Sequence, residues 1–247
     1  MKTEDFNLSD STHWRLYTPE NAQDGWVVLW LQGFTSTIDA HDVGNTRMSR
    51  VNNIRFAVLN YAGHGDHPVN LQNATREQQF EAVCGVYDEL EKLGLNKVIV
   101  IGCSIGAYMA ALLAGVKKPR AVVLRAPANY KEEEFSLTYK ETMESRDKEA
   151  KDLYRQSITS DYSNNAVEAV RRFEGDTYVI QHEKDSVINA AIPKSYYNAA
   201  KHGNYIVIRN CDHTPKMTKN PKVLYDIIER WIQTIIYVTI NGPDEDD

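Results

Sequence analysis

Short runs of β-branched and aromatic apolar residues recur along the chain, and the stretches between them carry apolar residues at helical spacing. The runs begin at Gly25, Ile54, Lys97, Ala121, Thr177 and Tyr205. Continuous apolar runs of this length are typical of strands buried on both faces. Their alternation with helices predicts an α/β fold, with a mostly parallel central sheet and helices on both of its faces. In such a fold, ligands bind beyond the carboxyl ends of the strands.

Two of the intervening segments have the pattern of amphipathic helices. Thr75 and Gln78 have the spacing of a capping box, and apolar residues follow at steps of three and four from Phe80 to Leu93. Near the end of the chain, Asn220 and Pro221 have the residue types of an N-cap and a first helical position. The wide apolar face that follows predicts a final helix packed on the sheet.

The segment from Ala128 to about Glu174 breaks this alternation. It is highly charged, has the composition of helices and shows no strand pattern. It is too long for a simple crossover between two strands. We therefore predict a helical cap insertion over residues 128–174, with the α/β core formed by residues 1–127 and 175–247. A longer surface crossover helix is the alternative.

Composition indicates the cellular compartment in which the protein is expected and the kind of molecule that it is expected to bind. The formal net charge of −6 and the scattered Lys and Arg residues argue against nucleic-acid binding. The first residues are polar and no apolar run approaches ~20 residues, so we expect neither a secretion signal nor a membrane span. Three cysteines without metal-type spacing favour a reducing, cytoplasmic setting. A small molecule is the expected partner, and the acidic end of the chain is expected to be disordered.

The stretch "KVIVIGCSIGAYMAALLAG" passes directly from a strand pattern into a helix pattern, with Ser104 at the junction. Gly102 and Gly106 lack a β-carbon, which lets a strand and a helix approach closely around a tight, strained turn. Such a turn would raise the Ser104 hydroxyl above the sheet, and the following helix N-terminus offers unpaired N–H groups to an oxyanion. This G-x-S-x-G pattern, in this context, predicts a nucleophilic serine.

A serine hydroxyl needs a base to take its proton and a third group to orient that base. His213 follows the last strand and precedes the last helix, so it belongs to the carboxyl edge of the sheet. Asp185 follows the preceding strand at the same edge, whereas Asp176 precedes that strand and Asp212 adjoins the histidine. We therefore predict Ser104 as nucleophile, His213 as base and Asp185 as the orienting acid. Their chain order is the one expected for a serine elbow.

The chain resembles the α/β-hydrolases over nearly its whole length, from about Trp14 to Ile236. The segments "GCSIG", "QHEKD" and "CDHT" match the nucleophile, acid and histidine positions of that family. The resemblance implies that no cofactor and no metal are needed, and that the backbone N–H groups of Phe34 and Ile105 form the oxyanion hole. The family's "HGF" reads "QGF" here, with Gln32 in place of the histidine. That change leaves the backbone donor in place.

The expected activity is that of a carboxylesterase, a serine hydrolase that cleaves small acyl esters through an acyl-enzyme. Thioesters, amides and carbon–carbon bonds remain open as substrates. Aromatic and thioether side chains of the insertion either line the acyl pocket or form the insertion's own core: Tyr130, Phe135, Tyr139, Met143 and Tyr154. The charge density of the insertion favours a short or aromatic acyl group over a long lipid chain.

Two rival readings remain. The loop "YAGHGDHP" resembles the family's Gly-His-Gly turn, but its His64, Asp66 and His67 are also a fragment of a zinc hydrolase ligand set. The same fold can also serve as a ligand-binding protein without activity. The complete set of serine, acid and histidine argues against that second reading.

Overall fold

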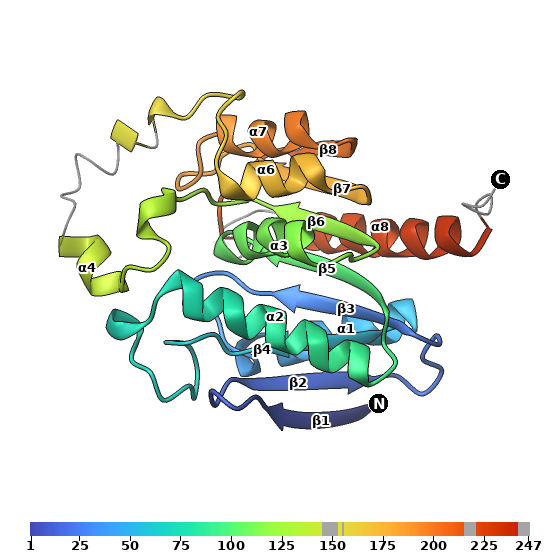
Figure 1. Cartoon of the computed structure of the whole chain (residues 1–247). Helices are drawn as coiled ribbons and strands as arrows, with labels where there is room; N and C mark the ends of the chain where they lie inside the picture. The colour runs from blue at the N-terminus through green and yellow to red at the C-terminus, as the bar shows by residue number, and fades with distance from the viewer. Residues whose placement is uncertain (145–152, 155, 215–220, 242–247) are drawn as a thin grey trace.

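The fold is built on one twisted sheet, seen in the computed structural model of Figure 1, which describes residues 1–144, 153–154, 156–214 and 221–241. Within these residues eight strands follow the order β1-β2-β4-β3-β5-β6-β7-β8. Their bounds are β1 Lys2–Asn7, β2 His13–Thr18, β3 Trp26–Leu31, β4 Arg55–Leu59, β5 Lys97–Cys103, β6 Ala121–Arg125, β7 Asp176–His182 and β8 His202–Ile208. The β1–β2 and β2–β4 pairs are antiparallel, and the pairs from β4 to β8 are parallel. The predicted α/β class is confirmed.

Most of the predicted strands bury both faces, and β8 is the exception, with only its last residue, Ile208, buried. In β3 every residue is buried, with Val27, Leu29 and Leu31 in one apolar core and Trp26, Val28 and Trp30 in the other. Because helices cover both faces of the sheet, the residues of such a strand alternate between two cores and read as one apolar run. The pair β1 and β2 was not predicted from the pattern. It forms an antiparallel edge in which β1 is partly exposed and polar.

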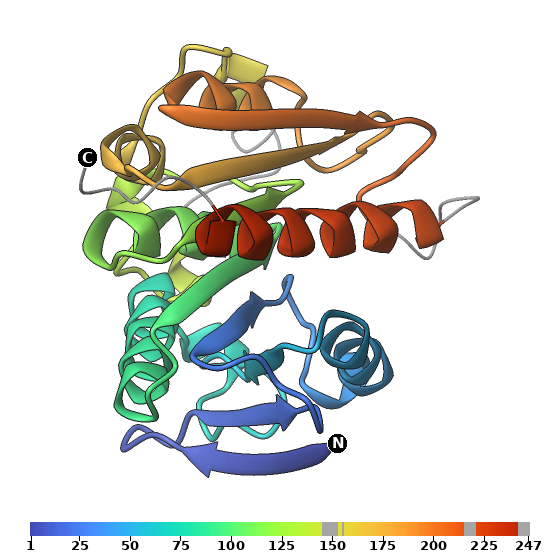
Figure 2. The same cartoon turned by 90° about the vertical axis from the view of Figure 1, so that its right-hand side faces the viewer.

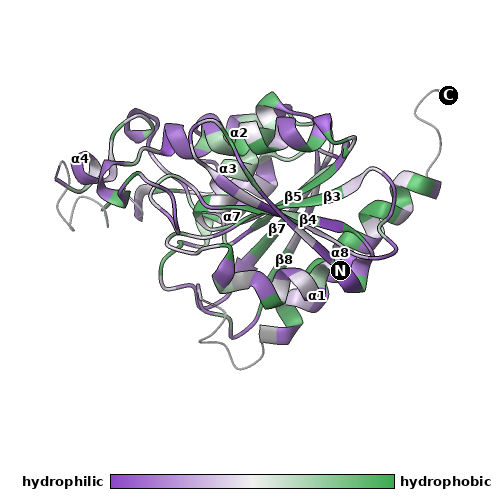
Figure 3. Ribbon diagram, turned by 90° about the horizontal axis from the view of Figure 1, so that it is seen from below, coloured by the Kyte–Doolittle hydropathy of each residue, from purple (hydrophilic) through white to green (hydrophobic). Residues whose placement is uncertain are grey.

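Helices cover both faces of the sheet. Figure 3 shows α2 and α3 on one side of the strands and α1 and α8 on the other, and Figure 2 shows α8 lying along its face of the sheet. The bounds are α1 Asp42–Asn52, α2 Arg76–Lys92, α3 Ile105–Val116, α4 Tyr139–Glu144, α6 Asn165–Arg172, α7 Ala191–Ala199 and α8 Pro221–Asn241, with short 3-10 turns at η1 Asp39–His41, η2 Leu71–Asn73 and η3 Glu132–Glu134. Among the described helices, none has the length and apolarity that a bilayer span requires.

The two predicted helices begin where the pattern placed them. The side chain of Thr75 accepts a hydrogen bond from the N–H of Gln78, whose side chain accepts one from the N–H of Thr75, so α2 has the predicted capping box. The last helix begins at Pro221, and its apolar face is buried. The proposed N-cap Asn220 and the acidic end of the chain lie outside the described residues.

The segment 128–174 divides into two parts. Its first part, with η3 and α4, lies beyond the carboxyl edge of the sheet, at the left of Figure 1. A β-bridge between Thr75 and Thr138 and a hydrogen bond from the N–H of Tyr139 to the carbonyl of Ala74 fix it to the start of α2. Its second part is α6, whose apolar residues pack against α3. The chain has therefore returned to the core by Asn165, before the expected boundary at 174; residues 145–152 and 155 lie outside the described residues.

Candidate active site

Ser104 lies at the turn between β5 and α3 in a backbone conformation that L-residues rarely adopt, with φ 55° and ψ −115°. Its N–H donates to the carbonyl of Arg125 over 3.0 Å. Gly102 and Gly106, which flank Ser104, are required because the backbone of a neighbouring segment approaches each of them too closely for a β-carbon. A β-carbon at residue 102 would lie 2.5 Å from Cα of Ala107, and one at residue 106 would lie 2.5 Å from the carbonyl carbon of Leu31. Ser104 therefore stands on a tight turn from strand to helix, at which the start of α3 lies against the end of β3.

The three residues predicted as a triad come together at the carboxyl edge of the sheet. Nε2 of His213 lies 3.1 Å from Oγ of Ser104, and Nδ1 of His213 lies 2.8 Å from Oδ2 of Asp185. A carboxylate only accepts hydrogen bonds, so Nδ1–H of His213 donates to it. The lone pair of Nε2 then faces the serine hydroxyl. This is the arrangement in which an imidazole can take a hydroxyl proton.

Asp185 is held as a carboxylate by the hydrogen bonds around it. Its side chain is only 5% exposed. Burial alone would raise its pKa, but the hydrogen bonds from His213 and from the N–H groups of Ile188 and Val187 outweigh burial and hold the pKa below its usual value. The ionised acid is therefore available to orient the imidazole at neutral pH.

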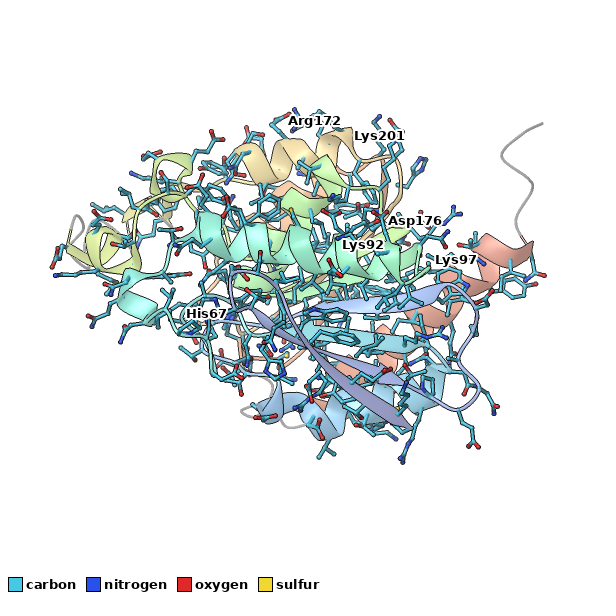
Figure 4. All side chains as sticks on the ribbon, turned by 60° about the horizontal axis from the view of Figure 1, so that its bottom comes forward. His67, Lys92, Lys97, Arg172, Asp176 and Lys201 are labelled. Carbon is cyan, nitrogen blue, oxygen red and sulfur yellow. The ribbon has the colours of Figure 1, made fainter. Side chains whose placement is uncertain are left out.

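Asp176, which the sequence analysis rejected as the orienting acid, lies at the end of the sheet opposite to the candidate site. Asp176 is the first residue of β7 and Lys97 the first of β5. Figure 4 shows both at the opposite end of the molecule from His67, which belongs to a loop at the carboxyl edge. The topological reason for choosing Asp185 over Asp176 therefore matches the structure.

The two expected oxyanion donors flank the elbow. A β-carbon on Gly33 would lie 3.9 Å from Cβ of Ser104, so the turn that carries Phe34 runs beside the serine. Ile105 is the first residue of α3, where an N–H has no partner within the helix. In the described part of the chain, neither N–H is a donor in a hydrogen bond outside the helices and strands.

Gln32 has a structural role that the sequence did not reveal. The side-chain amide of Gln32 donates a hydrogen bond to the carbonyl of Leu59 over 2.9 Å, and the backbone carbonyl of Gln32 accepts one from the hydroxyl of Tyr61 over 3.1 Å. Both bonds are buried. They fix the turn before Phe34 to β4, and the unusual glutamine in "QGF" was the one available signal.

The loop that suggested zinc has other partners. Asp66 contacts His13 Nδ1 over 2.9 Å and accepts the Asn60 amide over 2.7 Å, while Nδ1 of His67 accepts the N–H of Val69. His64 is buried, and burial lowers its pKa. Between residues 1 and 241, in the described parts, no three His, Cys, Asp or Glu side chains are grouped so as to hold a metal ion.

The aromatic residues of the insertion pack mainly against the core and one another. The Arg76 guanidinium lies 4.0 Å from the ring centre of Tyr130, and the ring of Phe135 lies 6.1 Å from that of Phe80. Met143 is 64% exposed. The hydroxyl of Tyr154 hydrogen-bonds that of Tyr162, over 3.0 Å. Of these three contacts, the one between Tyr154 and Tyr162 lies within the insertion, and the other two join the insertion to α2.

Tyr139 is the member of the set that reaches the candidate site. Its ring centre lies 5.3 Å from that of Phe34, and its hydroxyl donates to the side chain of Gln79 over 2.9 Å. The ring of Phe34 also meets His64 edge-on at 5.6 Å and is still 44% exposed. An exposed aromatic surface therefore stands directly beside the serine elbow.

Comparisons with known proteins bear on the fold. No protein-family model matches the chain, and no curated protein matches it in sequence. Solved structures do match. Est1E from Butyrivibrio proteoclasticus with bound ferulic acid has a TM-score of 0.71 at 13% identity, over 92% of this chain and 97% of its own. An arylesterase has a TM-score of 0.64 at 18% identity, over 95% and 84%. An esterase from Pyrobaculum calidifontis has a TM-score of 0.64 at 16% identity, over 97% and 86%. Together with the sheet order, these likenesses show that the chain has the α/β-hydrolase fold.

Proposed function

We propose that the protein is a serine hydrolase that cleaves small carboxylic acyl esters. The observation that carries the proposal is the hydrogen-bonded series from Ser104 through His213 to Asp185, built on a strained turn between strand and helix. A protein that only binds a ligand has no physical need for all three groups in this order. The esterases among the solved structures of the same fold support this choice.

The reaction follows from the geometry in two stages. His213 takes the hydroxyl proton as Oγ of Ser104 attacks the ester carbonyl, and the N–H groups of Phe34 and Ile105 hold the resulting oxyanion. Collapse of this intermediate breaks the ester bond, and His213 returns the proton to the leaving alcohol. A water molecule then attacks the acyl-enzyme by the same route, which releases the acid and restores the serine. Asp185 keeps the imidazole oriented throughout.

The acyl group is proposed to be short or aromatic. The backbone N–H of Phe34 is one of the proposed oxyanion donors, and the side chain of Phe34 is an exposed ring. A planar acyl group whose ester carbonyl binds that N–H would therefore stack on the ring. The ferulic acid bound to Est1E supports this choice. The same three residues would also serve thioesters, amides or carbon–carbon bonds, so matched ester, thioester and amide substrates belong in the first assays.

A serine-directed phosphonate tests the proposal directly. It should label the wild-type protein at Ser104 and leave folded Ser104→Ala unlabelled. Ser49→Ala is a matched control, because its buried hydroxyl, in α1, donates to the carbonyl of Ile54 over 2.8 Å and otherwise contacts Sδ of Met1 over 3.9 Å. Ser104→Ala and His213→Ala should each lower turnover on the order of 10⁶-fold, and the double variant scarcely further. Full esterase activity in Ser104→Ala would refute the mechanism and return attention to the loop of His64 and His67.

A nitrophenyl ester series of increasing acyl length tests the substrate. The highest kcat/KM is expected for short or aromatic acyl groups, and Phe34→Ala should lower the rate on the aromatic ester more than on the acetyl ester. A rate maximum at long acyl chains would contradict the proposed preference while leaving the triad intact.

A further inference from the structure

A second histidine lies buried directly behind the candidate triad. His182 is the last residue of β7 and is 1% exposed. Its Nδ1 lies 2.8 Å from the carbonyl oxygen of Asp212, the residue before His213. On its other side, Nε of Arg125 lies 3.3 Å from its Nε2. Arg125 is itself only 4% exposed, at the end of β6. The proposed reaction steps use neither side chain.

The arginine fixes which nitrogen of His182 carries the proton. A guanidinium has donors only, so Nε2 of His182 must be the acceptor of the Nε–H of Arg125. The proton of the neutral ring then sits on Nδ1 and is donated to the carbonyl of Asp212. Burial first, and the charge of Arg125 second, lower the pKa of His182 to about 4, so the ring stays neutral at neutral pH.

The same pair touches the chain beside each member of the triad. The carbonyl of Arg125 accepts the N–H of Ser104 over 3.0 Å, and the carbonyl of His182 accepts the N–H of Asp185 over 3.4 Å. Through the carbonyl of Asp212, His182 also holds the residue next to His213. The side chains and backbone atoms of Arg125 and His182 thus join the ends of β5, β6 and β7 to the loop that follows β8.

The loops of Asp185 and His213 are tied together at further points. The N–H of Lys184 donates to the carbonyl of Cys211 over 2.8 Å, and Ser186 donates from both its N–H and its hydroxyl to the Asp212 carboxylate. These contacts are exposed or lie in the loop backbone. The bond from His182 is one that anchors this loop pair to a buried side chain at the end of the sheet, so it contributes to where the imidazole of His213 stands.

We propose that Arg125 and His182 form a positioning pair that sets the imidazole of His213 against the hydroxyl of Ser104. The inference rests on the proposed function, because it concerns the efficiency of the same hydrolysis. Neither residue touches the reacting atoms, so loss of the pair reduces turnover and leaves substrate binding in place.

The test compares two replacements of the same ring. His182→Asn keeps an amide N–H where Nδ1–H stands, whereas His182→Leu fills similar space without a donor. Asn52→Leu is the matched control, because it removes a buried amide that donates to the carbonyl of Met48 over 2.8 Å in α1. For His182→Leu we expect kcat to fall ~10- to 100-fold with KM within about twofold, since a displacement of about 1 Å costs on the order of 10²-fold. His182→Asn should recover most of that loss, and Asn52→Leu should keep the wild-type kcat. The rate of phosphonate labelling should follow kcat.

Three results would overturn the pair: a folded His182→Leu with the wild-type kcat, a loss confined to KM, or His182→Asn as impaired as His182→Leu. If His182→Leu does not fold, nitrogen NMR of the wild type decides. A proton on Nδ1 of His182 that does not titrate between about pH 5 and 8 supports the pair, and a proton on Nε2 refutes it. An active Ser104→Ala would refute the proposed function instead, so the two failures are distinguishable.

Discussion

Replacing Gly106 by alanine perturbs the point where α3 and the end of β3 approach most closely. The new β-carbon would lie 2.5 Å from the carbonyl carbon of Leu31 and 2.7 Å from the carbonyl oxygen of Gln32. Real β-carbons are essentially never found within 3.0 Å of such atoms. The neighbours here are backbone atoms, which cannot rotate away as a side chain can. The helix start and the turn before Phe34 must therefore separate by at least about 0.5 Å.

The expected cost falls on activity more than on folding. Overpacking of this kind destabilises by about 1–3 kcal/mol, which is less than the roughly 5–15 kcal/mol that holds a domain folded. The same displacement moves the N–H groups of Phe34 and Ile105 apart, on the two sides of the proposed oxyanion. We expect turnover to fall ~10- to 100-fold, because about 1 Å of misplacement at a reacting group costs on the order of 10²-fold.

Gly44→Ala is the matched control. Nothing lies within 4 Å of a β-carbon built on Gly44, which belongs to α1. Alanine there should stabilise the protein by about 0.5–1 kcal/mol and leave turnover unchanged. Urea unfolding and the steady-state rate on a nitrophenyl ester measure both effects. A folded Gly106→Ala variant with turnover within about twofold of the wild type would refute the link between this approach and the proposed oxyanion hole.

Three further predictions concern the acid, the pH dependence of stability and the neighbouring thiol. Asp185→Asn should lower turnover on the order of 10⁴-fold, less than loss of Ser104, because the base remains but is badly oriented; an unchanged kcat would argue against the role of the acid. The pKa of His182 is lowered in the fold to about 4 by burial and by Arg125, so the unfolded chain binds the extra proton first. The free energy of unfolding should fall by up to about 3 kcal/mol between about pH 6.5 and 4, and His182→Asn should flatten this dependence in urea titrations. Cys103→Ser should remain active, and a folded but inert variant would count against Ser104.

Most parts of the fold that the sequence predicted are those in which the buried residues are apolar. Strands such as β3 and helix α2 place apolar residues at regular spacing because one apolar core or two surround them. Helix α1 escaped prediction because its buried positions include Asn45, Ser49 and Asn52, so its inner face does not read as apolar. The strand β1 escaped for a related reason, since it lies at the edge of the sheet and alternates exposed with half-buried residues.

The candidate triad could be predicted because strand topology alone decides which residues reach the carboxyl edge. The aromatic residues of the insertion could not be assigned in this way. Their places depend on contacts between distant segments, such as Arg76 against Tyr130 and the bridge between Thr75 and Thr138. His182 is the last residue of β7, and its partner Arg125 comes from the adjacent strand β6. A pattern along one strand does not reveal what the next strand places beside it.

The backbone at Ser104 also bears on how such a protein can evolve. A non-glycine residue with φ 55° and ψ −115° sacrifices roughly 1–3 kcal/mol of stability. Glycine would relieve that strain, whereas alanine would not, because it keeps the β-carbon. Selection for expression or heat resistance alone would therefore reward Ser104→Gly and drive the lineage toward a sturdier, inert protein. Any attempt to stabilise this chain by directed evolution must score turnover in every round, because one substitution that relieves backbone strain also removes the proposed nucleophile.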